Sequence, residues 1–334
     1  MSKFTITGLW ARLTRSWFHK RYFTKLPGTA AQAYVRFFDK AVKLPQERSA
    51  MRLDLPTYDG LSQAVHPDLL LHKGKVIMVA TPYPFGCDWY ENPCIFVSSN
   101  SKSFAPPAGV SQPLALPTEG FKNHLSDAEI HFWQGEYHII YRESLFKNSI
   151  GSDRLYLINS PDLIKWSKPT LLAEAEEGLL TCPSVVEHNG KRTMFHVAYP
   201  KNGEILLQRR DLLSASLGSA QQVELKGMPE GRVLWHIDIV PEGEKLLGLF
   251  TLSTGGGGQN TKLYYAQSTD GGASFEILHP IRLCSNEDKY FLSVYRASMY
   301  KGARGSWQAY VSARTAKHTW HIYYLPDFRV DWTF

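Results

Sequence analysis

The sequence Asp68-Leu-Leu-Leu-His-Lys-Gly-Lys-Val-Ile-Met-Val-Ala80 holds two short apolar runs on either side of a Lys-Gly pair. Two strands joined by a tight glycine turn form a β-hairpin. The arrangement returns along the chain, and its turn glycines lie 61, 55, 53 and 59 residues apart, at Gly74, Gly135, Gly190, Gly243 and Gly302. The chain therefore repeats one hairpin at a nearly even period.

A third apolar run closes each repeat, beginning at Ile95, Leu155, Ile205, Leu263 and His321. A period in this range, with three or four strands per unit, is typical of propeller blades. We therefore predict an all-β fold, a five-bladed β-propeller. An open sheet edge invites aggregation, so residues 51–55 or 328–332 are expected to supply a closing strand.

Positive charge is concentrated near the N-terminus. Residues 1–60 hold 11 Lys and Arg against 4 Asp and Glu, out of 37 and 31 in the whole chain. Aromatic and basic residues alternate in residues 10–23, and residues 30–42 show helical spacing. We predict a basic, mainly helical extension over residues 1–50 and the propeller over residues 51–334. The extension is either an arm that docks on a protein assembly or a membrane surface, or a solvated face.

The nearly neutral remainder does not look like a groove for nucleic acid, so no nucleic-acid partner is expected. No apolar run is long enough to span a bilayer, and no secretory signal is recognised at the N-terminus. Localisation is left open between the cytoplasm and an extracellular or virion assembly. The four cysteines lack zinc-type spacing and are expected to be reduced, buried thiols.

Two segments are predicted to be turns in which an aspartate caps backbone amides while an aromatic residue packs beneath the next blade. They are Ser160-Pro-Asp-Leu-Ile-Lys-Trp166 and Ser268-Thr-Asp-Gly-Gly-Ala-Ser-Phe275. We expect both turns to be structural.

Polar residues stand at the start of the first strand of each repeat. The inner strand of a propeller blade lines the axis, so these side chains should meet at one end of it. The segments are His66-Pro-Asp68, Ser126-Asp-Ala-Glu129, Thr181-Cys-Pro-Ser184, Trp235-His-Ile-Asp238 and Tyr295-Arg-Ala-Ser298. Convergent carboxylates suit cleavage of a glycosidic bond, which needs an acid on one side and a base or nucleophile on the other.

These segments, with Glu91-Asn-Pro-Cys-Ile-Phe-Val-Ser-Ser99 and the turn at 160–166, resemble the five-bladed glycoside hydrolases of arabinanase, xylosidase and fructosidase type, family 43 above all. The resemblance implies a catalytic Asp in the first blade, matched by Asp68, and an orienting Asp in the second, matched by Asp127. The family's third-blade Glu general acid is replaced here by Thr181-Cys182-Pro183. Glu129 is the nearest inner-strand substitute, with Glu177 and Glu187 as weaker candidates. The alternative for Asp68 and Asp127 is a strand-start cap.

Further residues are predicted to bind the sugar. His66, His236 and Asp238 would complete the ring around the axis, and Arg296 would grip hydroxyls or the carboxylate of an acidic sugar, or else tie blades together. In the loop after the second strand, Tyr83, Trp89 and Tyr90 would stack on a sugar ring and Asn92 would bind a hydroxyl, although the aromatic residues suit packing between blades equally well.

Other chemistries receive less support. Residues 255–258 are four glycines without a following Lys-Ser/Thr, so they are not a phosphate cradle. No histidine spacing argues for catalytic zinc; no cofactor is predicted, and a divalent ion in the axial channel is left open. Cys182 has no assignable base and is not expected to be a nucleophile.

Two functions follow. The first is a glycosidase-like enzyme acting on a poly- or oligosaccharide in an axial pocket. The second is a non-catalytic, carbohydrate-binding or structural propeller of a larger assembly, such as a cell-surface complex or a phage particle, that lacks the third-blade acid.

Overall fold

A computed structural model describes residues 49–328 except 118–122, 148–149, 176–177, 189, 201–202, 256–259, 282, 286–287, 289–290 and 303–304. The described part consists of strands, connecting loops and two short 3₁₀ turns, η1 (Pro84–Gly86) and η2 (Asp88–Tyr90). Within it, no helix is long and apolar enough to cross a membrane. The predicted all-β class is confirmed.

The strands form four hydrogen-bonded sheets. The first holds β2 (Ala64–His72), β3 (Lys75–Pro82) and β4 (Cys94–Ser98). The second holds β5 (His124–Trp133), β6 (Glu136–Lys147), β7 (Ile150–Ser160) and β8 (Thr170–Glu174). The third sheet consists of two antiparallel runs that join through a parallel pair, β12–β16. The first run is β9 (Leu179–His188), β10 (Lys191–Tyr199), β11 (Leu206–Asp211) and β12 (Gln221–Lys226). The second run is β13 (Val233–Glu242), β14 (Lys245–Ser253), β15 (Lys262–Ser268) and β16 (Ser274–Ile281).

The fourth sheet joins the two ends of the described chain. Its strand order is β17 (Cys284–Ser285), β1 (Ser49–Arg52), β20 (Trp320–Phe328), β19 (Trp307–Thr315) and β18 (Phe291–Lys301). Met51 in β1 pairs with Tyr324 in β20. The N-terminal segment considered, residues 51–55, therefore contributes Met51 and Arg52 to this strand, whereas the alternative, residues 328–332, lies outside the described residues except for Phe328. The extension predicted over residues 1–50 lies almost entirely outside the described residues.

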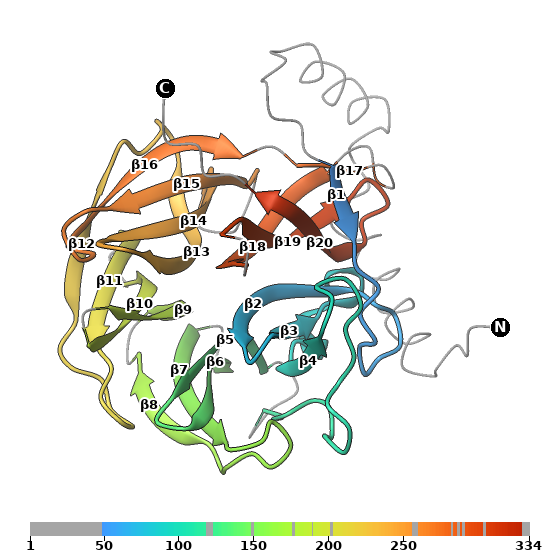
Figure 1. Cartoon of the computed structure of the whole chain (residues 1–334). Helices are drawn as coiled ribbons and strands as arrows, with labels where there is room; N and C mark the ends of the chain where they lie inside the picture. The colour runs from blue at the N-terminus through green and yellow to red at the C-terminus, as the bar shows by residue number, and fades with distance from the viewer. Residues whose placement is uncertain are drawn as a thin grey trace.

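The sheets stand around a common centre (Figure 1). The first strands β2, β5, β9, β13 and β18 contact one another in that order, and β18 contacts β2 again. This closed ring of inner strands is consistent with a β-propeller. The end of the axis at which these strands begin is called the mouth below.

The glycine hairpins are confirmed. Gly74, Gly135, Gly190 and Gly243 have positive φ, as tight turns between strands require. Gly302 is the exception, because a longer loop follows it and its N–H donates to the carbonyl of Ser306. The predicted third strands correspond to β4, β7, β11, β15 and β20.

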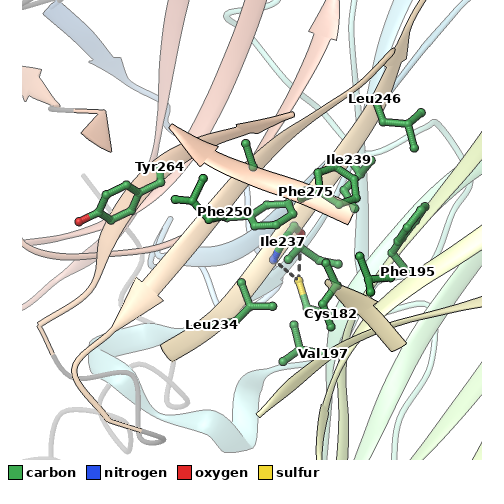
Figure 2. Close-up of a cluster of buried hydrophobic side chains, with 14 of the residues drawn as sticks. Cys182, Phe195, Val197, Leu234, Ile237, Ile239, Leu246, Phe250, Tyr264 and Phe275 are labelled. Atoms are coloured by element: carbon green, nitrogen blue, oxygen red, sulfur yellow. Dashed lines mark hydrogen bonds between the residues drawn. The ribbon is translucent and has the colours of Figure 1, made fainter. Parts of the chain in front are cut away.

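Apolar side chains fill the space between neighbouring sheets and between the two antiparallel runs of the third sheet. Figure 2 shows Cys182 and Phe195, from the β9–β12 run, facing Phe250 and Phe275 from the β13–β16 run. The Cys182 thiol donates to the carbonyl of Ile237 (3.0 Å) and accepts from its N–H (3.2 Å), a pair drawn in Figure 2. Cys182 and Cys94 are buried and free, as predicted, and Cys87 is free but partly exposed.

Both aspartate turns form as predicted. Asp162 Oδ1 accepts the N–H groups of Ile164 and Lys165, each at 2.9 Å. Asp270 Oδ1 accepts the N–H of Ser274 at 3.0 Å. Burial opposes ionisation of Asp270, but its hydrogen bonds with Ser274 and Ser268 lower its pKa to about 2. Phe275, which follows, is fully buried.

The second of these turns provides a matched test of packing. A Cβ at Gly272 would lie 2.5 Å from Phe195 Cζ, whereas a Cβ at Gly271 would meet nothing within 4 Å, and both glycines have positive φ. Each alanine variant pays the left-handed strain of roughly 1–2 kcal/mol. Gly272→Ala should cost about 1–3 kcal/mol more, because Phe195 must move. Urea unfolding measures the difference; equal stability of the two variants would contradict this packing.

Candidate active site

A break in strand register recurs at the same point of the inner strands. In β2 the pairing with β3 shifts between Val65 and Asp68, and β5, β9, β13 and β18 each show a shift at the corresponding place. The residues at the break in the first three strands have positive φ, 54° at His66, 52° at Asp127 and 53° at Cys182. Such values are uncommon outside glycine, and a bulge re-aims the side chain it carries.

Three side chains from these positions meet near the mouth. Nε2 of His236 lies 3.1 Å from Oδ1 of Asp127, and Nε2 of His66 lies 3.4 Å from the same oxygen. All three ligand-type atoms fall within 4.8 Å of one another, and the three residues are at most 4% exposed. Residues from three strands that are far apart in sequence thus share one small site.

Neighbouring groups fix these side chains in place. Thr81 Oγ1 lies 3.0 Å from Nδ1 of His66. Arg142 holds the other oxygen of Asp127, with Nε 3.0 Å from Oδ2, and also reaches Asp153 at 3.4 Å. Metal-binding and catalytic side chains commonly depend on such outer contacts for their orientation.

The electrostatics favour an ionised aspartate between neutral imidazoles. Burial opposes ionisation of Asp127, but the charge of Arg142, helped by the two histidines, outweighs it and lowers the pKa of Asp127 well below its usual value. Burial lowers the pKa of His66 and of His236, against the attraction of Asp127. Neutral imidazole and ionised carboxylate are the forms in which these groups bind metal ions.

The set fits a divalent cation. Nε2 of His66 makes no hydrogen bond to any described residue although it is buried, so it is available as a ligand. Two imidazole nitrogens and one carboxylate oxygen are typical of catalytic zinc, with the fourth position left to water. Ligands about 2.1 Å from a tetrahedral ion stand about 3.4 Å apart, close to the separations of Asp127 Oδ1 from the two histidines.

Tyr295 covers this cluster. Its ring centroid lies 4.8 Å from that of His66 and 4.5 Å from that of His236. Tyr295 is itself partly exposed, whereas the histidines beneath it are buried. A ligand approaching the histidines from this side must therefore displace the Tyr295 ring.

A second layer of polar side chains lies two residues further along the inner strands and ties each strand to the next. Asp68 Oδ2 accepts the N–H of Ile130 (2.8 Å), and Asp238 Oδ2 accepts the N–H of Met299 (2.9 Å). Ser184 Oγ likewise accepts the N–H of Ile239 at 3.0 Å, and Glu129 accepts the N–H of Val185. We call these four residues, Asp68, Glu129, Ser184 and Asp238, the inter-strand clips.

Arg296 is enclosed by the clips. Its Nη2 lies 2.8 Å from Asp68 Oδ1 and also donates to the carbonyl of Pro183, while Nη1 donates to that of Ala128. Arg296 is fully buried. Its contacts favour the alternative considered from sequence, an arginine that ties strands together, over one that grips a sugar.

Burial disfavours the ionised form of the clip carboxyl groups. It raises the pKa of Asp68 to about 7 and that of Glu129 to about 8, with Arg296 opposing both shifts. Burial and the neighbouring Asp68 raise the pKa of Asp238 well above its usual value. Of the three acids predicted to be catalytic, Asp127 thus lies in the mouth cluster, whereas Asp68 and Glu129 lie in the clip layer.

Glu91 is a site candidate that was not singled out from sequence. It is buried beside η2, with Oε1 3.9 Å from Nδ1 of His66 and Oε2 3.4 Å from Nε2 of His124. Burial raises its pKa well above the usual value, and nearby Asp88 and Asp127 reinforce the shift. A buried acid with a raised pKa, next to a carboxyl group with a lowered one, is a common arrangement for acid–base catalysis. Glu91 belongs to the Glu-Asn-Pro segment that was used for the family resemblance. Because this segment is a loop, its sequence did not indicate that the Glu91 side chain lies beside His66.

The predicted loop residues are only partly gathered at the site. Tyr83 stacks on Tyr295, with the rings 6.3 Å apart and nearly parallel, and both rings contact Trp320. Trp89 and Tyr90 are partly exposed within η2. Asn92 is buried and donates to Tyr58 Oη (3.1 Å), so it helps to hold the loop.

The third unit presents Thr181 and Cys182 at the point where a general acid was sought, and both are buried. Glu187 is exposed at the opposite end of β9, and Glu177 lies outside the described residues. No described carboxylate of β9 therefore joins the mouth cluster.

Neither a protein-family model nor a curated protein sequence matches this chain. Among solved structures, an N-acetylgalactosamine deacetylase from F. plautii, in complex with blood group B trisaccharide, has a TM-score of 0.74 at 16% identity, over 84% of this chain and 95% of that one. An exo-1,5-alpha-L-arabinanase from a bovine ruminal metagenomic library gives 0.56 at 16% identity, over 79% and 92%. A thermostable family-43 glycoside hydrolase gives 0.62 at 10% identity, over 81% and 91%.

These likenesses confirm the resemblance to the family-43 propellers at the level of the fold. Because one fold supports many chemistries, function has to be argued from the site itself.

The raised pKa of Glu129 predicts a pH dependence of stability. Between about pH 4.5 and pH 8 the folded protein keeps a proton on Glu129 that the unfolded chain has lost, so the free energy of unfolding should fall as pH rises through this range. Glu129→Gln should reduce that fall, by on the order of a few kcal/mol. Urea titrations at pH 5 and pH 8 measure it. The exposed Glu187 supplies the control variant, Glu187→Gln, and parallel pH profiles for wild type and Glu129→Gln would refute the prediction.

The mouth cluster predicts stabilisation by a divalent metal. Zn²⁺ at 100 times its dissociation constant should stabilise the wild type by about 2.7 kcal/mol. His236→Ala should lose most of this gain, because one of the three ligands is gone. The control is His188→Ala, since His188 lies on β9 outside the cluster. Thermal unfolding with Zn²⁺ or chelator measures the effect, and an equal gain in both variants would exclude His236 as a ligand.

Proposed function

We propose that this chain is a hydrolase that acts on a poly- or oligosaccharide at the mouth of the axis. One observation carries the proposal: His66, Asp127 and His236, from three inner strands, bring their ligand-type atoms within 4.8 Å of one another beneath Tyr295. Partly exposed aromatic rings above a cluster of this kind suit stacking on a sugar.

The proposed architecture is a five-bladed propeller. The two antiparallel runs of the eight-stranded sheet count as separate blades that share the parallel β12–β16 pair, and the other three sheets supply one blade each. Each blade then contributes one inner strand to the closed ring at the axis.

We favour hydrolysis of an amide or ester substituent on the sugar. Asp127 is engaged on one oxygen by the two histidines and on the other by Arg142, which suits a metal ligand better than a free nucleophile. A divalent ion held there would polarise the substrate carbonyl and lower the pKa of a water molecule. The fold supports such chemistry elsewhere, since the F. plautii protein is a sugar deacetylase.

Glu91 would serve as the general acid. Water would add its oxygen to the carbonyl carbon and release a proton to the solvent, and the bond from that carbon to the leaving nitrogen or oxygen would break. Glu91 would supply the proton to the leaving atom and regain one from the solvent. Burial raises the pKa of the Glu91 carboxyl group well above its usual value, which favours the protonated form that a general acid needs. His124, 3.4 Å from Glu91, would orient the carboxyl group.

Cleavage of a glycosidic bond is the second candidate. It needs a protonated and an ionised carboxyl group on opposite sides of the bond, and Glu91 and Asp127 have pKa shifts in opposite directions. The arabinanase and the family-43 hydrolase share the fold. In this candidate the catalytic roles predicted from sequence for Asp68 and Glu129 would pass to Asp127 and Glu91, because inter-strand contacts enclose Asp68 and Glu129.

One assay separates these candidates. Acetylated oligosaccharides are tested for released acetate, and arabinan and xylan for new reducing ends, each with Zn²⁺ or chelator. Wild type should release acetate with the metal, and Glu91→Gln should lower the rate by about 10²–10⁴-fold. Asp127→Asn should lose both activity and metal binding.

Glu187→Gln is the matched control, because this glutamate is exposed and remote from the mouth. New reducing ends without acetate would favour the glycosidase. Glycan binding without any bond cleavage would favour the non-catalytic propeller of a larger assembly. Full activity in both Glu91→Gln and Asp127→Asn would remove the mouth cluster from the mechanism.

A further inference from the structure

Arg314 is a guanidinium group at the mouth whose charge is not balanced. It lies near the end of β19 and pairs in register with Trp320 of β20. Its Nη2 lies 2.8 Å from Nδ1 of His318, and its Nε has no hydrogen-bond partner among the described residues. None of the described carboxylates forms an ion pair with it, although it is only partly exposed and burial lowers its pKa.

Alternation along β19 places this side chain toward the first sheet. Ala309, Val311 and Ala313 pack into the cluster shared with β14 and β15, so the residues between them point to the other side. Tyr310, on that other side, packs with residues of β3 and β4. Arg314 therefore faces the loop after β3, and its charge acts on Tyr83.

The aromatic rings connect Arg314 to the mouth cluster. Trp320, its register partner, lies 5.4 Å from Tyr295 between ring centroids, and Tyr295 covers His66 at 4.8 Å. Gln63 Oε1 accepts the N–H of both Trp320 (3.2 Å) and Phe85 (2.9 Å), which fixes the first and last sheets against each other here. Arg314 is thus linked to the mouth cluster through Trp320, its register partner, and Tyr295.

Two acids near Tyr83 do not neutralise this charge. Asp88 and Glu91 lie on the loop and act on Tyr83, but neither forms an ion pair with Arg314. Burial raises the pKa of both, which disfavours their charged forms. The other two arginines near the axis differ, because Arg142 and Arg296 each contact a carboxylate within 3.0 Å.

We propose that Arg314 is a specificity residue that selects a sugar bearing one negative charge, a carboxylate or a sulfate ester, next to the ring that reacts. A guanidinium group offers paired donors whose geometry matches these anions. This inference rests on the proposed carbohydrate site and adds the class of sugar. It moves the acid-recognising role considered for Arg296 from a fully buried residue to a partly exposed one.

The test compares ligands that differ only in charge. Oligogalacturonides are titrated calorimetrically against the same oligosaccharides after reduction of their carboxyl groups to neutral galactose, and sulfated galactan oligosaccharides form a third arm. Wild type should bind a charged set at least about 10-fold more tightly than the neutral one, since a hydrogen bond to a charged group supplies that much. The arm with the tighter binding distinguishes carboxylate from sulfate.

Variants locate the effect. Arg314→Gln should bind charged and neutral sets alike, and Arg314→Lys should keep part of the preference. Arg154→Gln, which removes the same charge from an exposed pair with Glu174, should keep all of it. Thermal unfolding shows whether each variant is folded. If Arg314→Gln does not fold, the Arg314→Lys variant decides, because an unchanged preference there would overturn the role of the guanidinium group.

The outcomes separate this inference from the proposed function. If the wild type binds neutral and charged oligosaccharides equally, the proposed carbohydrate site is supported and the proposed role of Arg314 is overturned. Equal weakening of both ligand sets in Arg314→Gln also overturns it. Wild type that binds none of the three sets overturns the carbohydrate site, and this inference falls with it.

Discussion

The hydrogen bond from the backbone of one inner strand to a side chain of the strand before it is the contact on which the rest of the structure depends. Asp68, Glu129, Ser184 and Asp238 each accept an N–H group from the next inner strand. A carboxyl or hydroxyl group can reach across where two inner strands converge without pairing, and it satisfies a donor that would otherwise be buried and unpaired.

Acids used in this way are expensive to bury. Three carboxyl groups, Asp68, Glu129 and Asp238, surround Arg296, and full ionisation of all three would leave a net negative charge away from water. The raised pKa values of Asp68 and Glu129, about 7 and about 8, show how the charge is limited. Protonation of these carboxyl groups and the charge of Arg296 together lower the free-energy cost of burying the clip layer. The clips in turn fix the position of each inner strand along the axis relative to the next.

That fixed position is what lets the mouth cluster form. The register break lies two residues before the clip in β2 and β5, so clipping the strands also aligns His66 with Asp127. In these two strands the residue at the break has a positive φ, and its side chain joins the mouth cluster. The clips therefore position the candidate catalytic groups without belonging to them.

The same break limits what the sequence could predict. Hairpins, third strands and aspartate turns depend on local patterns, and these predictions are confirmed. From alternation alone, Asp127 and Glu129 should share a strand face and hence a role. The positive φ of Asp127 separates them, and no residue type in this segment signals a left-handed aspartate. Glu91 was missed because a loop residue has no periodicity to reveal which way it faces.

Three arginines near the axis show how charge is distributed with depth. Arg296 is enclosed in the clip layer and contacts Asp68, and Arg142 contacts both Asp127 and Asp153 nearer the mouth. Arg314, beyond the aromatic rings, has none of the described carboxylates as an ion-pair partner. A buried guanidinium group must be neutralised from within the protein, whereas one that still reaches the surface can leave that task to solvent or to a ligand. Of these three arginines, Arg314 is therefore the one whose charge a bound anion could compensate.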